Sequence, residues 1–510
     1  MESKPPKGTR DYDPTLESQR QRIVDICKKV CMIYGAQPIQ TPLFEVKHLI
    51  MEKYSNDTDN EVTKQVYDLC EGESIVSSLK NILDKSDVSR DVRRDVRRDV
   101  SRDVDGSGDG ESGSSGDKTK EELIRECIED FEKSEQCVLR YDLTVPFARF
   151  VKTVDCNKLT RYQIGTVYRK DQPNMKSGRF REFMQCDFDI LGNDNDPIAA
   201  NAETLDALYT MLSMLDVQKF VIKVNSRSVL EDLFNYCKVP NELFRPICSS
   251  IDKLDKHDWK YVKNDMESKG LSAEAIGMLQ FKIEEIKTET KNNWSVDSIN
   301  KIDILCDETK KELIHLRENL DFRLSGSYAK NFQFDISLAR GLDYYTSLIF
   351  EVVVSSPKGK IIGSVAGGGR YDKLCGVKCV GFSIGIDRLL NYLQSEKKLE
   401  DTLIPPTYDF WVIQVGDKLK QETEEMLFRR RQEVVKKFRQ FGWKAGTELR
   451  PSAGLGNQMK LALKMRIPYV IFIGEQEYKS EKMTIKIMKQ QQQYDMLTFP
   501  EIMLLVKNSK

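Results

Sequence analysis

The order of hydrophobic and polar positions predicts alternating helices and strands over most of the chain. Between residues 14 and 34, apolar residues recur with the helical period at Leu16, Ile23, Val24, Ile26, Val30 and Ile33. Residues 160–170 and 181–191 have the character of two strands joined by a polar loop. The charged stretch 229–320 is rich in helical spacing, so we expect an inserted helical subdomain there.

The second of these strands alternates sharply between apolar and polar residues. One face carries Met184, Cys186, Phe188 and Ile190, and the other carries Phe183, Gln185, Asp187 and Asp189. A strand with one apolar face and three polar groups on the other is a candidate floor for a binding site. The pattern alone favours a simpler interpretation, in which the polar side of a half-exposed strand meets water.

Strand patterning resumes after the helical stretch. Residues 332–337, 342–354 and 380–386 each have strand character, and a helix is expected directly after the last of them. The triplet Gly367-Gly368-Gly369 predicts a tight turn between strands.

The last hundred residues differ from the rest. After a linker at Pro405-Pro406, strands and helices alternate as in a small α/β domain. We therefore expect two domains, 1–404 and 405–510, with the helical insertion inside the first.

A low-complexity segment interrupts the first domain. A four-residue unit, Asp-Val-Ser/Arg-Arg, repeats from Asp87 to Val104 and continues into GSGDGESGSSG. This composition predicts a disordered insert at about 85–118. An RNA-binding arm is the alternative, which the near-equal numbers of aspartate and arginine weaken.

Charge separates the two expected domains. The chain has 79 Lys+Arg and 80 Asp+Glu, a net of -1, which excludes a protein that coats nucleic acid or an anionic membrane through its overall charge. Residues 405–510 carry a net charge of +7, which leaves -8 for the remainder. A basic terminal domain suits contact with nucleic acid, and a solvated basic face explains the charge equally well.

Neither membrane nor metal signals stand out. No apolar run approaches the roughly 18 residues of a membrane-spanning helix, and no signal peptide is visible. The 12 cysteines are scattered, which is typical of free thiols in a reducing compartment. Cys375 and Cys379 have the wrong spacing for a zinc knuckle and no second pair follows, so no structural metal is expected.

Three arginines on or beside strands are the strongest chemical signal. The chain has no phosphate-binding glycine loop of the P-loop or Rossmann type and no nucleophile elbow. Arg169, Arg340 and Arg388 offer forked donors that suit phosphate oxygens, so a nucleotide site on an antiparallel sheet is plausible.

Several longer motifs carry a family resemblance. They are PKGTRDYDP near the N-terminus, QTPLFE at 40–45, LRYDLTVPFARF at 139–150, VYRKDQPNMKSGRFREFMQCDFDILG at 167–192, ARGLDYYTSLIFEVV at 339–353, SVAGGGRYDKL at 364–374 and VGFSIGIDRLL at 380–390. Together they resemble the class II histidyl-tRNA synthetases of the eukaryotic cytosolic type. The resemblance covers nearly the whole chain apart from the low-complexity insert.

The resemblance implies a fold and an activity. The fold would be an α+β catalytic domain on an antiparallel sheet, with a helical insertion and a C-terminal α/β anticodon-binding domain. The reaction would join L-histidine to its tRNA through histidyl-adenylate, with ATP as substrate and Mg²⁺ beside it. A cytoplasmic homodimer that binds ATP, histidine and tRNA but no membrane would follow.

The resemblance also implies residue roles. For ATP, Arg169 would contact the α-phosphate, Arg388 the γ-phosphate, and Arg340 would stabilise charge on the α-phosphate during attack. The histidine-binding set would comprise Asp142, Leu143, Thr144, Gln185, Asp189, Tyr344, Tyr345 and Tyr371. Within it, Asp189 and Tyr345 would hold the imidazole. Because neighbouring residues of a regular strand point to opposite faces, Tyr345 is preferred over Tyr344.

One departure and two alternatives remain. Ser347 stands where the family usually has glycine, a small change. The chain could instead be a synthetase-like regulatory protein without catalysis, although such proteins typically lose catalytic arginines or the C-terminal domain. A pure RNA-binding protein would not need the polar strand face.

Removing the low-complexity insert tests its predicted character. We expect a chain that lacks residues 86–116, closed by a short Gly/Ser bridge, to retain nearly full histidine-dependent pyrophosphate exchange, because a disordered loop adds little to a core. A collapse of the cooperative melting transition would show that the segment is an ordered element.

Overall fold

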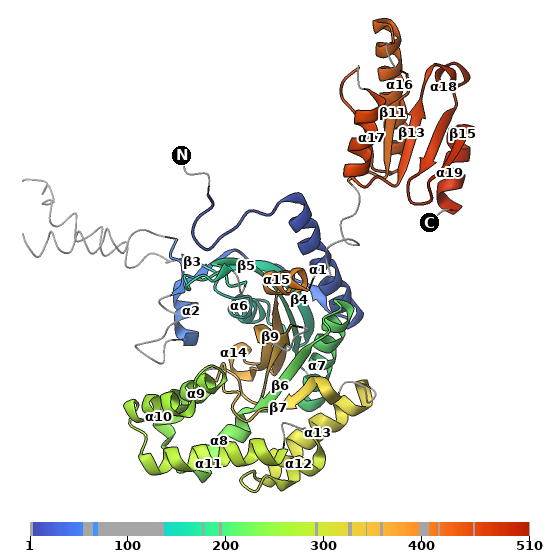
Figure 1. The fold of residues 1–510 in the computed structure, drawn as a ribbon. Coiled ribbons are helices and arrows are strands. Elements are labelled where there is room, and N and C mark those ends of the chain that lie inside the picture. Colours follow the sequence, from blue (N-terminus) through green and yellow to red (C-terminus); the bar gives the residue numbers. More distant parts are fainter. Residues whose placement is uncertain are drawn as a thin grey trace, which may run out of the picture. The chain divides into compact units, whose positions relative to one another are not determined.

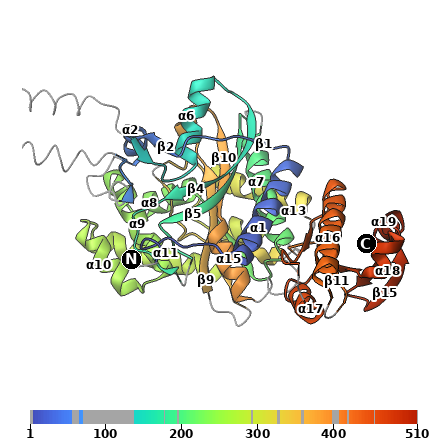
Figure 2. The same cartoon turned by 90° about the horizontal axis from the view of Figure 1, so that it is seen from above.

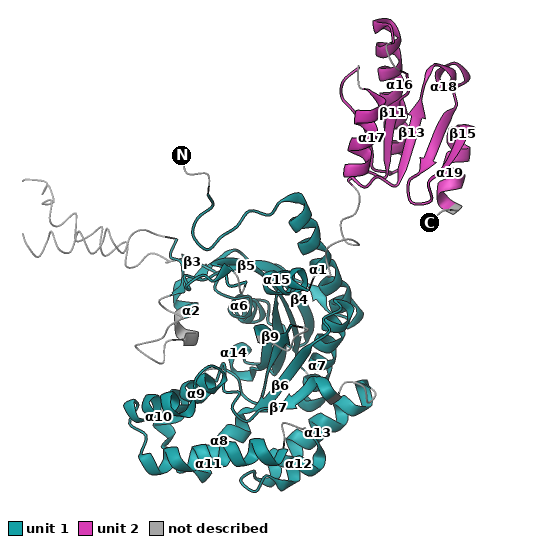
Figure 3. Cartoon of the chain, in the orientation of Figure 1, with its two compact units in different colours: residues 1–400 teal, residues 401–510 magenta. Residues whose placement is uncertain are grey.

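The chain forms two compact units, residues 1–400 and 401–510, which are described separately (Figure 3). A computed structural model describes residues 4–54, 65–69, 137–175, 178–192, 196–290, 294–324, 329–342, 344–356, 361–396, 407–416, 419–451 and 454–508. The insert predicted at 85–118 lies outside the described residues, as does a helix that the sequence favours at 120–133.

An eight-stranded sheet organises unit 1 (Figure 1). Its strands, in spatial order, are β1 (Gln37–Pro38), β4 (Leu159–Tyr168), β5 (Glu182–Leu191), β10 (Cys379–Gly385), β9 (Ile361–Arg370), β8 (Leu348–Ser355), β6 (Phe220–Ser226) and β7 (Phe332–Phe334). Neighbours pair antiparallel through the centre, and only the edge pairs β1–β4 and β6–β7 are parallel. The antiparallel sheet predicted for the catalytic domain is confirmed.

Three helices cover the apolar face of this sheet. They are α1 (Pro14–Ile33), α7 (Pro197–Met214) and α15 (Ile386–Ser395), and they contact one another and the strands β5 and β10. Cys186 and Phe188 of β5 are fully buried on this side, where the Phe188 ring stacks on Phe382. Helix α1 begins where the Asp13 side chain accepts from the backbone N–H of Leu16.

The opposite face of the sheet carries the polar residues. Helix α6 (Thr144–Val154) lies on that side, across the sheet from α1 and α7 (Figures 1 and 2). The short elements β2 (Phe44–Val46), α2 (Lys47–Tyr54), β3 (Cys137–Leu139) and α14 (Asp372–Cys375) complete this side, with β2 paired to β3. The alternation predicted for 181–191 is confirmed, with its apolar residues under the helices.

The helical insertion is present as predicted. It consists of α8 (Arg227–Tyr236), η2 (Asn241–Leu243), α9 (Phe244–Ile251), η3 (Asp252–Asp255), α10 (Trp259–Ser268), α11 (Ala273–Thr290), α12 (Val296–Lys301), α13 (Asp307–Leu324) and η4 (Ala329–Asn331). Trp294 follows α11 and precedes α12 in the sequence. Its side chain is fully buried, and its ring packs against Phe332 of β7. This contact ties the insertion to the edge of the sheet.

The glycine triplet is not a turn, so that prediction is wrong. Gly367, Gly368 and Gly369 lie inside β9 and pair with strands on both sides. A Cβ on Gly368 would come within 2.6 Å of the Phe350 ring, and one on Gly369 within 2.7 Å of the Tyr345 ring. The atoms nearest to these two added Cβ atoms are the backbone carbonyl oxygens of Gly381 and Leu348. Glycine is therefore needed at 368 and 369 because neighbouring backbone and aromatic rings both approach closely, which a sequence pattern does not reveal.

Unit 2 is a five-stranded sheet with helices. Its strands, in spatial order, are β12 (Ala445–Thr447), β11 (Phe410–Gln414), β13 (Tyr469–Ile473), β14 (Met483–Ile487) and β15 (Gln492–Leu497). The helices are α16 (Gln421–Gln440), α17 (Leu455–Lys464), α18 (Glu475–Ser480) and α19 (Phe499–Asn508). The predicted C-terminal α/β domain is confirmed, while β15 and α18 were not predicted. No helix in the described part of either unit has the length and apolar character needed to cross a membrane.

Candidate active site

Two rows of side chains cross the polar face of the sheet in unit 1. The strand registers give the first row as Arg161, Asp189, Gly381, Gly369 and Ile349. They give the second row as Gln163, Asp187, Ser383, Gly367 and Glu351. Each row thus has charged or polar side chains on β4 and β5 and at least one glycine on the central strands β10 and β9. The missing side chains at these glycines leave room above the sheet.

This room is a pocket of about 640 Å³. Every residue that the sequence suggested for ATP or histidine lines it except Leu143, that is, Asp142, Thr144, Arg169, Gln185, Asp189, Arg340, Tyr344, Tyr345, Tyr371 and Arg388. Leu143 is fully buried, and its carbonyl oxygen accepts from Arg161 at 3.4 Å. The fold therefore brings residues together that are up to 246 positions apart in the sequence.

Asp189 sits at the closed end of the pocket between a cation and a phenol. The Arg161 guanidinium lies 2.7 Å from its Oδ2, and the Tyr371 hydroxyl donates to its Oδ1. Arg161 is itself fully buried and lies 4.1 Å from the centre of the Phe147 ring of α6. Burial, followed by the neighbouring Asp189 charge, raises the pKa of Tyr371 well above its ordinary value, so Tyr371 acts as a hydrogen-bond donor.

Asp142 marks the entry to helix α6. One of its carboxylate oxygens accepts from the backbone N–H groups of Thr144 and Val145, at 3.1 and 3.0 Å. An acidic side chain at a helix N-terminus is favoured by the exposed N–H groups and by the helix dipole. These bonds fix the position of the Asp142 carboxylate at the pocket wall.

The two tyrosines do not lie on a regular strand, so the argument from opposite strand faces is wrong. Strand β8 begins only at Leu348, and the backbone N–H groups of Tyr344 and Tyr345 both donate to the carbonyl of Gly341 in a turn. Their rings lie 4.3 Å apart and both line the pocket. The pKa of Tyr345 is raised well above its usual value by burial and then by Tyr344.

Arginines gather at the other end of the pocket. Arg169 follows the end of β4, and Arg388 lies in α15 directly after β10. Both line the pocket together with Arg179, a residue that the sequence did not suggest. Burial lowers the pKa of Arg388 to about 10, and the nearby charges of Arg179 and Arg169 contribute. Like charges held together in this way favour a polyanionic ligand.

Backbone and aromatic contacts orient these arginines. Arg388 donates to the Ser364 carbonyl at 2.7 Å, and Arg169 donates to the Tyr141 carbonyl at 3.2 Å. The Arg169 guanidinium also lies 4.3 Å from the centre of the Tyr141 ring. Side chains that are positioned before a ligand arrives lose less conformational freedom on binding.

Arg340 is paired with two carboxylates. Its Nε lies 3.0 Å from Asp252 of the helical insertion, and its Nη1 contacts Glu351 of β8. The Glu351 side chain is only 4% exposed, so it depends on this partner for its charge. Arg340 therefore forms salt bridges beside the strand and lines the pocket at the same time.

Four charged lining residues were missed by sequence reasoning. They are Asp171, Arg179, Asp187 and Glu351, which contribute charge to the pocket but were assigned no role. Asp187 could have been found, because it lies between Gln185 and Asp189 on the polar face of the alternating strand. Arg179 lies in a polar loop and Glu351 within an apolar run, and neither pattern marks a site.

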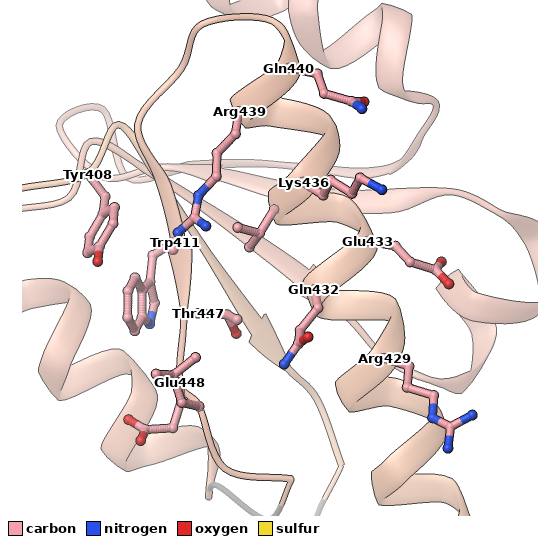
Figure 4. Close-up of a pocket in the computed structure, with 13 residues that line it drawn as sticks. Tyr408, Trp411, Arg429, Gln432, Glu433, Lys436, Arg439, Gln440, Thr447 and Glu448 are labelled. Atoms are coloured by element: carbon pink, nitrogen blue, oxygen red, sulfur yellow. The ribbon is translucent and has the colours of Figure 1, made fainter.

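A larger pocket of about 1030 Å³ lies in unit 2. It forms between α16 and the strand segments around Trp411 and Thr447 (Figure 4). Tyr408 and Trp411 lie side by side with ring centres 5.3 Å apart, and Arg439 reaches toward Trp411 from the helix. Lys436 and Arg429 add positive charge, while Glu433 and Glu448 line the same pocket and Trp411 is largely buried. The lining therefore has a small excess of positive charge, which suits contact with nucleic acid.

Comparison with known proteins identifies the family of each unit. A family model described as histidyl-tRNA synthetase matches residues 112–389, and one described as anticodon binding domain matches residues 409–507. The cytoplasmic histidine–tRNA ligase of Dictyostelium discoideum is 33% identical over 504 residues, which is 97% of this chain and 88% of that protein. The mitochondrial histidine–tRNA ligase of Homo sapiens is 31% identical over 506 residues, covering 95% and 84%.

A solved structure shares the fold. The crystal structure of histidyl-tRNA synthetase from Nostoc sp. aligns with a TM-score of 0.65 and 21% identity, covering 97% of this chain and 96% of that one. At this identity the comparison supports the fold alone.

Gly381 provides a test of the pocket floor. We expect Gly381→Ala to raise the KM for histidine, by roughly tenfold or more, because the added Cβ collides with the Asp189 carboxylate and lies 2.5 Å from the Phe188 carbonyl. Gly277→Ala in α11 is the matched control, since its Cβ meets no atom within 4 Å. Histidine-dependent pyrophosphate exchange measures both, and equal kinetics for the two variants would contradict this geometry.

Proposed function

The chain belongs to the histidyl-tRNA synthetase family, and on this premise we propose how its residues bind and activate the substrates. It is a histidine–tRNA ligase that joins L-histidine to tRNA with the use of ATP, through a histidyl-adenylate. The single observation that supports the residue roles is a pocket with buried carboxylates at one end and a cluster of arginines at the other.

The arginine end binds ATP. Arg169 contacts the α-phosphate and Arg388 the γ-phosphate, which suits a row of forked donors held by backbone carbonyls. Arg179 adds positive charge beside Arg388. The guanidinium groups repel one another, and a bound triphosphate offsets this repulsion because its negative charges attract each of them.

The carboxylate end binds histidine. Asp189 and Tyr345 hold the two nitrogens of the imidazole, Tyr371 keeps Asp189 in place, and Tyr344 packs beside Tyr345. Asp142, Thr144 and Gln185 contact the α-amino group. Leu143 takes part only through the backbone, because its side chain is buried behind the pocket. A site of this kind rejects apolar isosteres, since they would leave buried polar groups without partners.

Adenylation then requires an in-line displacement at phosphorus. An oxygen of the histidine carboxylate forms a bond to the α-phosphorus, the bond to the bridging oxygen breaks, and pyrophosphate leaves. Negative charge builds on the α-phosphate oxygens as this occurs. Arg340 stabilises that charge more in the transition state than in the ground state, which accelerates the step.

Mg²⁺ would enter with ATP. This ion is usually held by one or two carboxylates together with phosphate oxygens and water, and a dedicated protein cage is not needed. Glu351 and Asp171 both line the pocket among the arginines, and each has the oxygen ligands that this demand requires. The ion would neutralise charge on the phosphates.

Unit 2 contacts the anticodon region of the tRNA, and its pocket beside α16 is the surface we assign to this contact. The boundary between the two compact units lies between residues 400 and 401, close to the limit that we predicted at 404, which suits a separate catalytic part and a separate tRNA-binding part.

The homodimer that we propose would use the segment around Leu43 and Phe44, whose side chains are 46% and 56% exposed. We also propose a cytoplasmic location, on the basis of relatives named as cytoplasmic, although mitochondrial relatives are equally similar.

A regulatory protein without catalysis is the competing function. It would bind histidine or tRNA but would have no use for Arg169, Arg340 and Arg388 in one pocket. Histidine-dependent exchange of pyrophosphate into ATP separates the two functions, because only the ligase performs it.

Replacing Arg340 tests its catalytic role. We expect Arg340→Ala to lower the rate of pyrophosphate exchange by about 10²–10³-fold, and to lower the melting temperature because Glu351 is left as a buried unpaired charge. The double variant Arg340→Ala/Glu351→Gln should recover the melting temperature, and its exchange rate should stay well below that of Glu351→Gln alone, the reference that accounts for loss of a proposed Mg²⁺ ligand. If exchange recovers together with stability, Arg340 is only a structural residue.

Separating the units tests the role of the basic tail. We expect a chain that ends at Thr402 to activate histidine at near-normal rate, because the pocket residues all lie in unit 1. Its KM for tRNA should rise about tenfold or more, the equivalent of roughly 1.4 kcal/mol of binding. The measurements are pyrophosphate exchange and charging of total tRNA, and equal charging by both chains would refute an anticodon role for unit 2.

A further inference from the structure

Asp187 is a buried carboxylate in the active site that the roles above leave unused. It lies on the pocket side of β5 between Gln185 and Asp189, and it is 2% exposed. Its Oδ1 is buried and has no hydrogen-bond partner among the described residues, and the same holds for Oε1 of Gln185. The hydroxyl of Ser383 on β10 is a side-chain donor that acts on Asp187, and the two acceptors can take more hydrogen bonds than it supplies, so this arrangement favours a ligand that donates hydrogen bonds.

The charges around Asp187 do not balance. Two buried guanidinium groups act on this region. Arg161 lies 2.7 Å from Asp189 but 3.8 Å from Asp187, beyond hydrogen-bonding distance. Arg140 also attracts Asp187, but its guanidinium donates to backbone carbonyls. Asp142 adds a further negative charge from the start of α6. Two cations therefore face three carboxylates, and Asp187 has the less direct partner. The closed end of the pocket thus has an excess of negative charge that a cationic ligand would neutralise.

We propose that Asp187 is a further specificity-determining residue, which binds the α-ammonium group of histidine together with Gln185. A primary ammonium offers three donors, enough for both orphan acceptors and one more. Residues two apart on a strand are about 7 Å apart, so a ligand whose ring reaches Asp189 carries its amino group back toward Asp187 and Gln185. This inference rests on the proposed function of the pocket.

Titration of Asp187 agrees with this role. Burial raises its pKa to about 7, Arg161 opposes the rise, and Asp189 and Asp142 add to it, while the hydroxyl of Ser383 on β10 lowers it. The group is therefore largely protonated below about pH 7 in the empty pocket and ionised above it. An ammonium group favours the ionised form, so binding below that pH expels a proton and weakens as the pH falls.

The test compares histidine with imidazole-4-propionate, which lacks only the amino group, by calorimetric titration of the full chain. Asp187→Asn should weaken histidine binding roughly 10- to 100-fold and change the affinity for the des-amino compound little. Asp189→Asn is the matched control, since it should weaken both ligands. The wild-type preference for histidine should also grow between pH 6 and pH 8, and this growth should be absent in Asp187→Asn.

A second measurement keeps the test decisive if Asp187→Asn folds poorly. Titrations of the wild-type protein at pH 6.5 in two buffers of different ionisation enthalpy report the protons released on binding. After the protons that each ligand's own imidazole loses are subtracted with the use of its free pKa, histidine should release more protons than the des-amino compound. Equal release, or equal weakening of both ligands by Asp187→Asn, would overturn the role of Asp187 while leaving the proposed ligase intact. Failure of the ligase itself would appear instead as absent pyrophosphate exchange in the wild type.

Discussion

The burial of one guanidinium group determines the architecture of the active site. Arg161 is fully enclosed between the Phe147 ring and Asp189, and its charge must be compensated because solvent does not reach it. This requirement fixes β4 against β5 and holds α6 over the sheet. The carboxylates that face the ligand are consequently held by the core, and the pocket keeps its shape without a ligand inside.

The sequence predicted much of the fold because the relevant patterns are local. The alternation in 181–191 and the amphipathic spacing of 14–34 each reflect one buried face, and both elements are confirmed. β15 was missed because its glutamines and partial exposure at the sheet edge give no apolar alternation. α18 has only six residues, too few for a periodic signal. Local periodicity thus fails where an element is short or lies at an edge.

The site was predicted less completely, because it depends on contacts between distant segments. The glycine triplet was assigned to a turn, since its need for small residues comes from Tyr345, Phe350 and backbone carbonyls on neighbouring segments. Tyr344 and Tyr345 were treated as strand residues, and the turn that brings both rings to the pocket depends on Gly341. The family motifs supplied the expected residues, but the charge balance around Asp187 and Arg388 appears only when strands from both halves of unit 1 are assembled.

The ion pair between Arg340 and Asp252 joins the sheet to the helical insertion. The residues are 88 positions apart, one beside the strands and the other in the inserted helices. A substitution that changes the charge at either position alters the electrostatic environment of the other. The inserted helices are therefore part of the electrostatics of the active site, and replacing them with other helices would require an acid at the same place.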